Sequence, residues 1–278
     1  MGTDWTWDET LFAGAARYYE QGRLPYPPDL AATFARVLGL DGAGRLLDVG
    51  CGPGSVALLL ARLFEEVVGV DADPGMVEQA RRLAAERGVG NARFMHRRAE
   101  ELPGGLRRFR VVTFAASFHW MDRPLVAGLV HSMLTGDGAV VHVDERRELP
   151  VADQPAPHPA PPEAEIDALL RSYLGPERRA GRSIRTSSPS GEPAIFRAAG
   201  FDGPDDVPIP DGRILERTLD QIVADTFSRS YAAPHLFGDR LAAFERDLRT
   251  LLLVASPEGL FSVRRPDGLL HLYRPARV

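Results

Sequence analysis

The chain of 278 residues contains no lysine, so all 33 of its basic side chains are arginines. Without lysine the protein has no side-chain amine for Schiff-base chemistry, and it lacks the G-x-x-x-x-G-K-[ST] motif of a phosphate-binding P-loop. Protein-kinase chemistry, which uses a strand lysine, is excluded for the same reason. Asparagine occurs once, as Asn91, while Ala, Gly, Pro and Arg are abundant. This bias indicates a GC-rich bacterial genome.

Cysteine is nearly absent too. Cys51 is the single cysteine, which excludes an intrachain disulfide and favours a reducing compartment, the cytoplasm. No apolar run approaches the roughly 18 residues of a membrane span, and the N-terminal segment is too polar for a signal peptide. The net charge of −5 argues against a generic nucleic-acid binder, which would be basic. We expect no nucleic-acid or membrane partner, and a monomer or homodimer.

Short apolar runs alternate with helical segments between residues 40 and 145. The runs predict buried strands at 46–49, 67–70, 92–95, 110–116 and 139–143, and helices are predicted at 55–64, 74–87 and 123–134. Strands that are apolar throughout are typical of a sheet covered on both faces. The alternation predicts a doubly wound α/β domain with a mainly parallel sheet.

The segments on either side of this core have a different composition. Helices are predicted at 8–21, 29–38, 163–174, 218–231 and 239–254, a Pro-rich segment at 150–162, and a loop at 175–193. Phe261–Arg264 and Leu269–Arg274 flank a turn and predict a hairpin. The predicted organisation is a helical lid at 1–39, a core at 40–148, a substrate-capping insertion at 149–260 and C-terminal strands at 261–278 that complete the sheet. Arginines 178, 179, 182 and 185 form either a solvated loop or a capture site for an anion.

A glycine-rich loop directly follows the first predicted strand. It reads Asp48-Val49-Gly50-Cys51-Gly52-Pro53-Gly54, and a helix begins after it. Glycines allow close backbone approach to a ligand at the helix N-terminus. Asp48 would repel a pyrophosphate but suits a ligand with a cationic amino group. Asp71 ends the next strand, where a carboxylate can accept hydrogen bonds from ribose hydroxyls.

In these features the sequence resembles the class I methyltransferases that use S-adenosyl-L-methionine (SAM), of the small-molecule type. The resemblance is carried by LLDVGCGPG (46–54), VVGVDADPGMVEQAR (67–81), RAEELP (98–103), VVTFAASFHWMD (111–122) and GAVVHVD (138–144). It implies a seven-stranded, mostly parallel, Rossmann-like sheet, with SAM as cofactor and S-adenosyl-L-homocysteine (SAH) as product.

The resemblance also implies roles for individual residues. Asp48, Gly50, Gly52 and Gly54 would shape the methionine end of the cofactor pocket, Asp71 would hold the ribose, Ala72 and Met76 would flank adenine, Ala99 and Glu100 would face the adenine edge, and Ala116 and Ser117 would lie beside the cofactor. Many relatives carry Gly-Asp where this chain has Arg97-Arg98, which puts adenine recognition there in doubt. In the N-terminal segment, Tyr19 would cover the sulfonium and Arg23 would pair with the cofactor carboxylate.

Residues for the chemistry itself are less well defined. His119 follows the fourth strand and is the candidate general base, with packing over the cofactor as the alternative. Trp120 is a candidate for the acceptor pocket or for the core. Phe227, Tyr231 and His235 are candidates for contact with the acceptor. His131, His142 and His158 lack metal-ligand spacing and no C-x-x-C pair exists, so no metal site is expected.

These observations favour transfer of a methyl group to an O, N or C atom of a small molecule, such as a bacterial natural product. The alternative is a SAM-binding protein of this fold that catalyses another reaction, for example a cyclisation, or that acts without catalysis. A nicotinamide oxidoreductase is disfavoured by Asp48 and by the early Gly54. A nucleic-acid base methylase is disfavoured because Ala116-Ser117-Phe118-His119 replaces the Asn/Asp-Pro-Pro-aromatic motif.

Overall fold

A seven-stranded sheet organises the protein. The computed structural model describes residues 8–277 except 147–154, 178, 181–182 and 185–190. The strand order is β3-β2-β1-β4-β5-β11-β8, with β1 Arg45–Val49, β2 Glu66–Asp71, β3 Ala92–His96, β4 Phe109–Ala115, β5 Leu134–Arg146, β8 Phe201–Ile209 and β11 Asp267–Pro275. The first five strands in this order run parallel, and β11 is antiparallel to both β5 and β8. The predicted mostly parallel, seven-stranded fold is confirmed.

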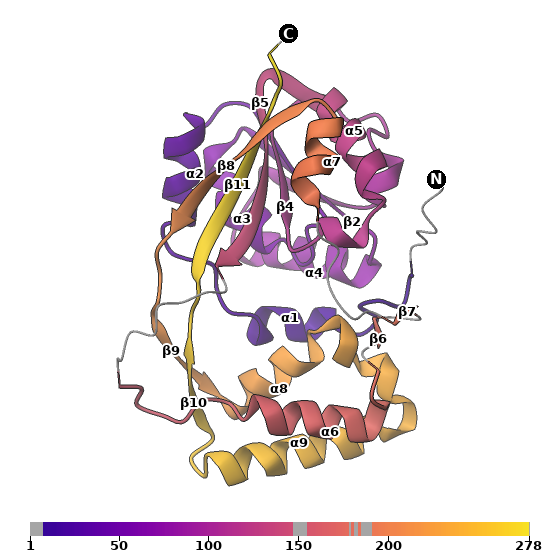
Figure 1. Ribbon diagram of the computed structural model, residues 1–278, viewed down its shortest axis with the longest axis vertical. Coiled ribbons are helices and arrows are strands. Elements are labelled where there is room, and N and C mark those ends of the chain that lie inside the picture. The colour runs from indigo at the N-terminus through magenta and orange to yellow at the C-terminus, as the bar shows by residue number, and fades with distance from the viewer. Residues whose placement is uncertain (1–7, 147–154, 178, 181–182, 185–190, 278) are drawn as a thin grey trace.

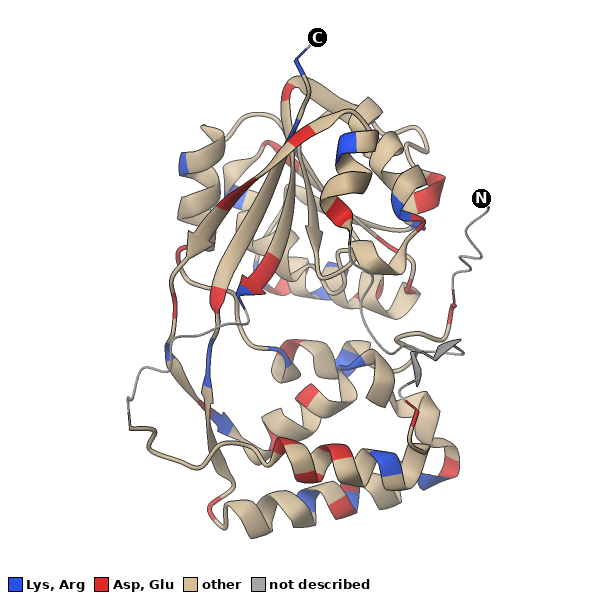
Figure 2. Ribbon diagram, in the orientation of Figure 1, with Lys and Arg blue, Asp and Glu red and all other residues tan. Residues whose placement is uncertain are grey.

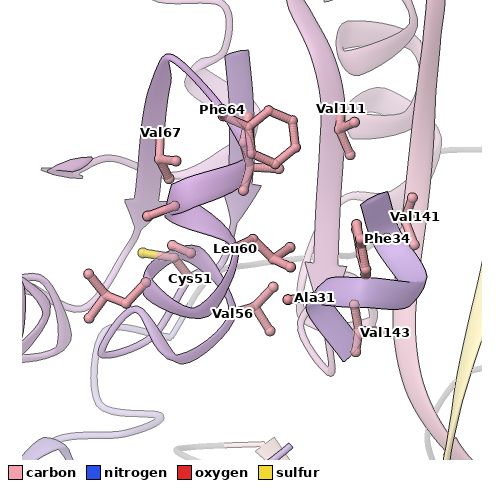
Figure 3. Close-up of a cluster of buried hydrophobic side chains, with 14 of the residues drawn as sticks. Ala31, Phe34, Cys51, Val56, Leu60, Phe64, Val67, Val111, Val141 and Val143 are labelled. Carbon is pink, nitrogen blue, oxygen red and sulfur yellow. The ribbon is translucent and has the colours of Figure 1, made fainter. Parts of the chain in front are cut away.

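Helices cover both faces of this sheet (Figure 1). One face packs against α2 (Leu30–Leu38), α3 (Ser55–Leu60), η1 (Ala61–Leu63) and α4 (Pro74–Glu86). The other packs against η2 (Ala99–Glu101), η3 (Phe118–Trp120), α5 (Arg123–Met133) and α7 (Glu192–Ala198). Successive strand residues alternate between the two cores: Val111 belongs to the first and Val112 to the second. Figure 3 shows the first core, where Phe34 of α2 and Leu60 of α3 lie near Val111 and Val141.

A second unit, the cap, packs around its own apolar cluster. It consists of α6 (Glu163–Leu174), β9 (Ile214–Thr218), α8 (Leu219–Phe227), η4 (Ser230–Ala232), η5 (Pro234–Arg240), α9 (Leu241–Ala255) and β10 (Leu260–Arg264). Phe227, Phe244 and Phe261 are fully buried at its centre. Figure 1 shows α1 (Ala16–Gly22) lying between the cap helices and the sheet. The short strands β6 (Arg179–Ala180) and β7 (Ser183–Ile184) pair with each other.

The chain enters and leaves the cap more often than the sequence predicts. The insertion predicted at 149–260 is interrupted, because α7 and β8 return to the main sheet before β9 begins. The predicted hairpin of Phe261–Arg264 with Leu269–Arg274 is wrong: β10 pairs with β9 in a separate two-stranded sheet, and β11 pairs with β5 and β8. Only β11 of the C-terminal segment therefore completes the main sheet.

The charges along two cap helices and the apolar character of the described helices are relevant to possible partners. Figure 2 shows basic and acidic residues interspersed along α6 and α9. No described helix combines the length and the apolar character needed to cross a lipid bilayer.

Candidate functional site

The loop after β1 turns sharply beneath a cavity at the carboxyl edge of the sheet. Gly50, Gly52 and Gly54 all adopt positive φ, at 68°, 54° and 82°, a region that residues with a Cβ rarely enter. A Cβ on Gly50 would lie 2.5 Å from Cβ of Ser117, so close packing as well as φ requires glycine there. The N–H groups of Gly50 and Cys51 both donate to the carbonyl of Val70, which fixes the turn against β2.

Asp48 lies behind this loop, with only 1% of its surface exposed. Its Oδ1 accepts from the Thr113 hydroxyl at 2.8 Å and its Oδ2 from the Ala57 N–H at 3.2 Å. Burial raises its pKa to about 7, against the opposing effect of these two hydrogen bonds. Asp48 therefore joins β1, β4 and α3 from beneath the loop.

Asp71, at the end of β2, holds the glycine loop in place through its carboxylate. Its Oδ2 accepts from the Gly52 N–H and its Oδ1 from the Asp73 N–H, both at 2.8 Å. A carboxylate has about four lone-pair sites, so both oxygens retain acceptor capacity toward the cavity that Asp71 lines. Burial raises the pKa of Asp71 to about 6. Near neutral pH it is an ionised acceptor facing the cavity.

A cavity opens beside the glycine loop at the carboxyl edge of the sheet. Its walls come from the segment before α1, from α1, and from the carboxyl ends of β1, β2, β3 and β4. The lining residues are Phe12, Tyr19, Gly50, Gly52, Asp71, Ala72, Met76, Arg97, Ala99, Glu100, Ala115, Ala116, Ser117, Trp120 and Met121. Every residue that the sequence assigns to the cofactor pocket is among them, except Arg23, Asp48 and Gly54. The cofactor-binding role of each remains a prediction.

The carboxylates of Asp71 and Glu100 both line the cavity. Glu100 accepts from the Asp122 N–H at 2.9 Å and forms an ion pair with Arg98 at 3.5 Å. These contacts fix the Glu100 carboxylate in the part of the wall that η2 forms after β3. Arg97 also lines the cavity, and its guanidinium donates to the carbonyl of Gly104.

Part of the cavity wall is apolar. Phe12 and Trp120 meet edge to face, with ring centroids 6.0 Å apart, and both line the cavity together with Met121. Ala116, between β4 and η3, has φ 51° although it carries a Cβ. Backbone strain of this kind often accompanies binding sites, and here it turns the chain from β4 toward Trp120. Phe12, Ala115 and Met121 are lining residues that the sequence did not identify, because nothing in their local sequence marks the cavity. Arg97, which the sequence placed at the adenine edge without a definite role, also lines it.

Several predicted residues lie elsewhere. Arg23 donates through Nη2 to the carbonyl of Ser228 in the cap, 3.1 Å away, and does not line the cavity. Phe227 is fully buried in the cap cluster, so its prediction as an acceptor contact is wrong. Tyr231 accepts from Arg229 at 2.8 Å in a separate hollow of the cap, and His235 contacts the Ala13 carbonyl at 3.2 Å. Neither of these two lines the cavity, and their contact with an acceptor remains a prediction.

His119 lies beside the cavity without being one of its lining residues. Its ring packs against Trp120, with centroids 4.7 Å apart. His119 also lowers the pKa of Glu192, although less than His142 and Arg123 do. The contact with Trp120 favours a packing role for His119. The role of His119 as a general base remains a prediction. No group of three or more potential metal ligands occurs among the described residues.

Comparison with known proteins identifies the core. Residues 46–138 match the family described as a methyltransferase domain. The uncharacterised methyltransferase YcgJ of Bacillus subtilis is 32% identical over 149 residues, 53% of this chain and 59% of that protein. The 2-heptyl-1-hydroxyquinolin-4(1H)-one methyltransferase of Mycobacteroides abscessus is 32% identical over 134 residues, 47% of this chain and 58% of that protein. The chain thus spans less than two thirds of the length of these relatives.

A further relative is similar to a shorter stretch of this chain, and three solved structures are similar to most of it. A 23S rRNA (uracil(1939)-C(5))-methyltransferase of Xylella fastidiosa is 52% identical over 64 residues, which are 22% of this chain and 14% of that protein. The crystal structure of YcgJ has a TM-score of 0.51 at 24% identity and covers 89% of this chain and 98% of that chain. The [4+2]-cyclase SpnF has a TM-score of 0.55 at 17% identity and covers 99% and 100%.

A SAM-dependent methyltransferase of Geobacter sulfurreducens, in complex with SAH, has a TM-score of 0.52 at 16% identity and covers 95% of this chain and 97% of that chain. At these identities the likeness shows the fold alone. Since methyltransferases and a cyclase share it, the reaction has to be argued from the site.

Proposed function

We propose that this chain, whose residues 46–138 match a methyltransferase-domain family, is a class I methyltransferase that uses SAM to methylate an O, N or C atom of a small molecule. When bound, SAM supplies a methyl group activated by its sulfonium. The contribution of the protein is to orient the acceptor and to exclude water from the reacting atoms.

The observation that carries this proposal is the pairing of the glycine loop with Asp71 on one wall of the cavity. The positive-φ glycines leave the backbone open to a ligand, since a Cβ on Gly52 would meet nothing within 4 Å. Asp71 is fixed by two backbone N–H groups and offers acceptor sites suited to the two ribose hydroxyls. Glu100, beyond it, suits the adenine amino group. The chemistry and order of these residues therefore fit SAM.

The apolar part of the cavity wall supports a small, flat acceptor. Phe12 and Trp120 present adjoining aromatic rings to such a molecule, and Tyr19 and Met121 also line the cavity. A methyltransferase relative is named for a heptyl-hydroxyquinolinone, an apolar aromatic compound. The interspersed charges on α6 and α9 suit a small-molecule partner better than a nucleic acid, which is bound by clustered basic residues.

The wider setting belongs to the same proposal. We take the protein to be bacterial and cytoplasmic, to serve secondary metabolism, and to be a monomer or homodimer. The composition without lysine supports a GC-rich bacterium, and the single buried thiol of Cys51 is compatible with a reducing compartment.

Calorimetry with SAH, SAM and NAD tests the cofactor assignment. We expect SAM and SAH to bind and NAD not to bind. Asp71→Ala should weaken SAH binding by about 100-fold, because two hydrogen bonds to a charged acceptor at roughly 1–3 kcal/mol each are lost. The control is Glu78→Ala on the exposed face of α4, with unchanged affinity. Equal SAH affinity in Asp71→Ala and the control would contradict the assigned pocket. Turnover of candidate aromatic acceptors then separates methyl transfer from other reactions of the same fold.

A further inference from the structure

Helix α1 packs more closely against the cap than against the sheet unit. A Cβ on Gly22, at the end of α1, would lie 2.5 Å from the backbone of Ala224 in α8, so the two helices touch backbone to backbone. The ring of Tyr18 lies 5.0 Å from that of Phe227, and Tyr18 packs against the apolar cluster of the cap. Helix α1 is therefore part of the packing of the cap.

Buried and exposed arginines fix this contact from both sides. Arg217 of β9 is 5% exposed, and its Nη2 donates to the carbonyls of Gln21 and Gly22 at 2.7 and 2.8 Å. These are the last carbonyls of α1, where the helix dipole is negative and a cation is stabilising. In return Arg23, which follows α1, donates to the carbonyl of Ser228 at the end of α8. The C-terminal end of α1 is thus capped by Arg217 of β9, and the C-terminal end of α8 is capped by Arg23, which follows α1.

The contact of α1 with the sheet unit is weaker in kind. Glu20 pairs with Arg87 at 2.7 Å and with Arg82 at 3.9 Å, and all three side chains are well exposed. Exposed ion pairs of this kind contribute little to stability. The apolar part of the contact is a small cluster of Ala15, Met76 of α4 and Ala233 of the cap. This interface can open at a smaller energetic cost than the interface between α1 and α8.

The cavity lies across this weaker interface. Tyr19 of α1 and Phe12, in the segment before it, form one wall, while the glycine loop and the ends of the strands form the other walls. We propose that Arg217 is a positioning residue that couples α1 to the cap, so that α1 and the cap uncover and close the cavity as one body. Arg217 acts on bound ligand through Tyr19 and Phe12, which it does not contact itself.

One buried residue contacts several of the described segments that join the two units. Arg265, 1% exposed, donates through Nε to the carbonyl of Pro25 at 2.8 Å and forms an ion pair with Glu145 at the end of β5. Its backbone N–H donates to the carbonyl of Arg213, also at 2.8 Å. Arg265 thus ties the segment after α1, the segment between β8 and β9, and the main sheet at one point, about which the cap turns.

A pair of engineered disulfides tests this inference. A Cβ on Gly75 of α4 would lie 3.7 Å from Cβ of Ala16 in α1, within the 3.5–4.5 Å of a disulfide. Ala16→Cys with Gly75→Cys therefore locks α1 to the sheet unit. Gly14→Cys with Pro234→Cys, whose Cβ atoms would be 3.5 Å apart, links the segment before α1 to the cap and serves as the matched control. Native Cys51 is buried and does not compete.

The readout is the rate at which labelled SAH enters and leaves, each oxidised pair being compared with the same pair reduced. We expect the Ala16–Gly75 lock to slow both rates at least tenfold, with recovery in dithiothreitol, and the Gly14–Pro234 lock to change them less than twofold. Unchanged rates in the first lock, or equal slowing in both, would overturn the inference. SAH is chosen as the probe because of the proposed function, so this experiment rests on that function. If SAH does not bind to the wild type, the proposed function is rejected, and hydrogen exchange of the free protein then tests the coupling of α1 to the cap.

Hydrogen exchange of the free protein needs no ligand. In Arg217→Met we expect the amides of residues 16–22 to exchange at least tenfold faster than in the wild type, with β1 and β4 unchanged. Arg217→Lys, which keeps a cation near the same carbonyls, should restore part of the protection. Unchanged protection of residues 16–22 in Arg217→Met, or equal loss of protection in β1, would refute the coupling. In variants that bind SAH, faster release with an unchanged rate of methyl transfer separates positioning from catalysis.

Discussion

The carboxylate of Asp48 lies between β1, β4 and α3, where burial disfavours its ionised form. It is 1% exposed and accepts two hydrogen bonds, yet burial still raises its pKa to about 7. The folded protein therefore holds a proton on Asp48 over a pH range in which the unfolded chain has released it. Folding stability is linked to pH through this difference in bound protons.

Asp48→Asn should change the pH dependence of stability in a defined direction. Because the folded pKa of Asp48 exceeds the unfolded value near 3.8, its ionisation lowers the stability of the wild type as pH rises from about 4 to 7. Asparagine cannot ionise, so the variant should gain stability relative to the wild type over this interval, by a few kcal/mol at most. Urea unfolding at pH 5 and pH 8 measures the difference. A relative stability that falls or stays constant between these two values would contradict the assignment.

Gly50→Ala tests the geometry of the loop. Alanine at φ 68° is strained, and its Cβ would lie 2.5 Å from Cβ of Ser117, so we expect a loss of about 2–4 kcal/mol in unfolding free energy. Gly52→Ala is the matched control, since φ is also positive but its Cβ would meet nothing within 4 Å. Its loss should be about 1 kcal/mol. Thermal unfolding of the two variants distinguishes crowding from strain, and equal losses would exclude the crowding.

Local sequence motifs predicted the cavity residues between Gly50 and Ser117 better than they predicted the contacts of Arg23 and Phe227. The residues from Gly50 to Ser117 that face the cavity lie at strand ends, and strand ends can be read from apolar runs and glycines. Arg23 was assigned to a carboxylate from its place near the motif, but its partner is Ser228, 205 positions away. Phe227 carries no local signal that distinguishes a cap core from a cavity wall. Contacts of this kind depend on how distant elements pack.

At the scale of elements, the strands that the sequence missed are those without an apolar run. β8 contains two prolines and three aspartates, and it lies at the edge of the sheet. An edge strand tolerates proline because one side of its backbone needs no partner, and its composition therefore resembles that of a loop. By contrast, α6 was predicted at 163–174 and extends over Glu163–Leu174, because its apolar residues repeat with helical spacing.

Phe201→Ala tests whether β8 is an integral part of the sheet unit. Phe201 is 2% exposed, and its ring lies 5.4 Å from that of Phe196 within the second core. Removing such a side chain should lower the unfolding free energy by about 3–5 kcal/mol. Val207→Ala, at a half-buried position of the same strand, should cost about 1 kcal/mol. Urea unfolding followed by circular dichroism measures both, and a cost below 1 kcal/mol for Phe201→Ala would place β8 outside the core.

At the scale of the whole molecule, the apolar side chains form two units that meet at the cavity. Two clusters cover the faces of the sheet, and a third lies within the cap. Separate clusters favour separate cooperative opening of the units. Because the cap has an apolar cluster of its own, it can lose stability without loss of the sheet. The sequence did not predict this division, because the chain crosses between the units several times.

Phe244→Ala should loosen the cap and α1 together. Phe244 is fully buried, and its ring stacks on that of Phe237 with centroids 4.2 Å apart, so its removal should destabilise the cap by about 3–5 kcal/mol. In native-state hydrogen exchange, residues 16–22, 219–227 and 241–255 should lose protection as a group, while β1 and β4 keep theirs. Phe114→Ala, in a core of the sheet unit, should give the reverse pattern. If residues 16–22 instead followed β1 and β4 in both variants, α1 would belong to the sheet unit, and the cavity would open between α1 and the cap.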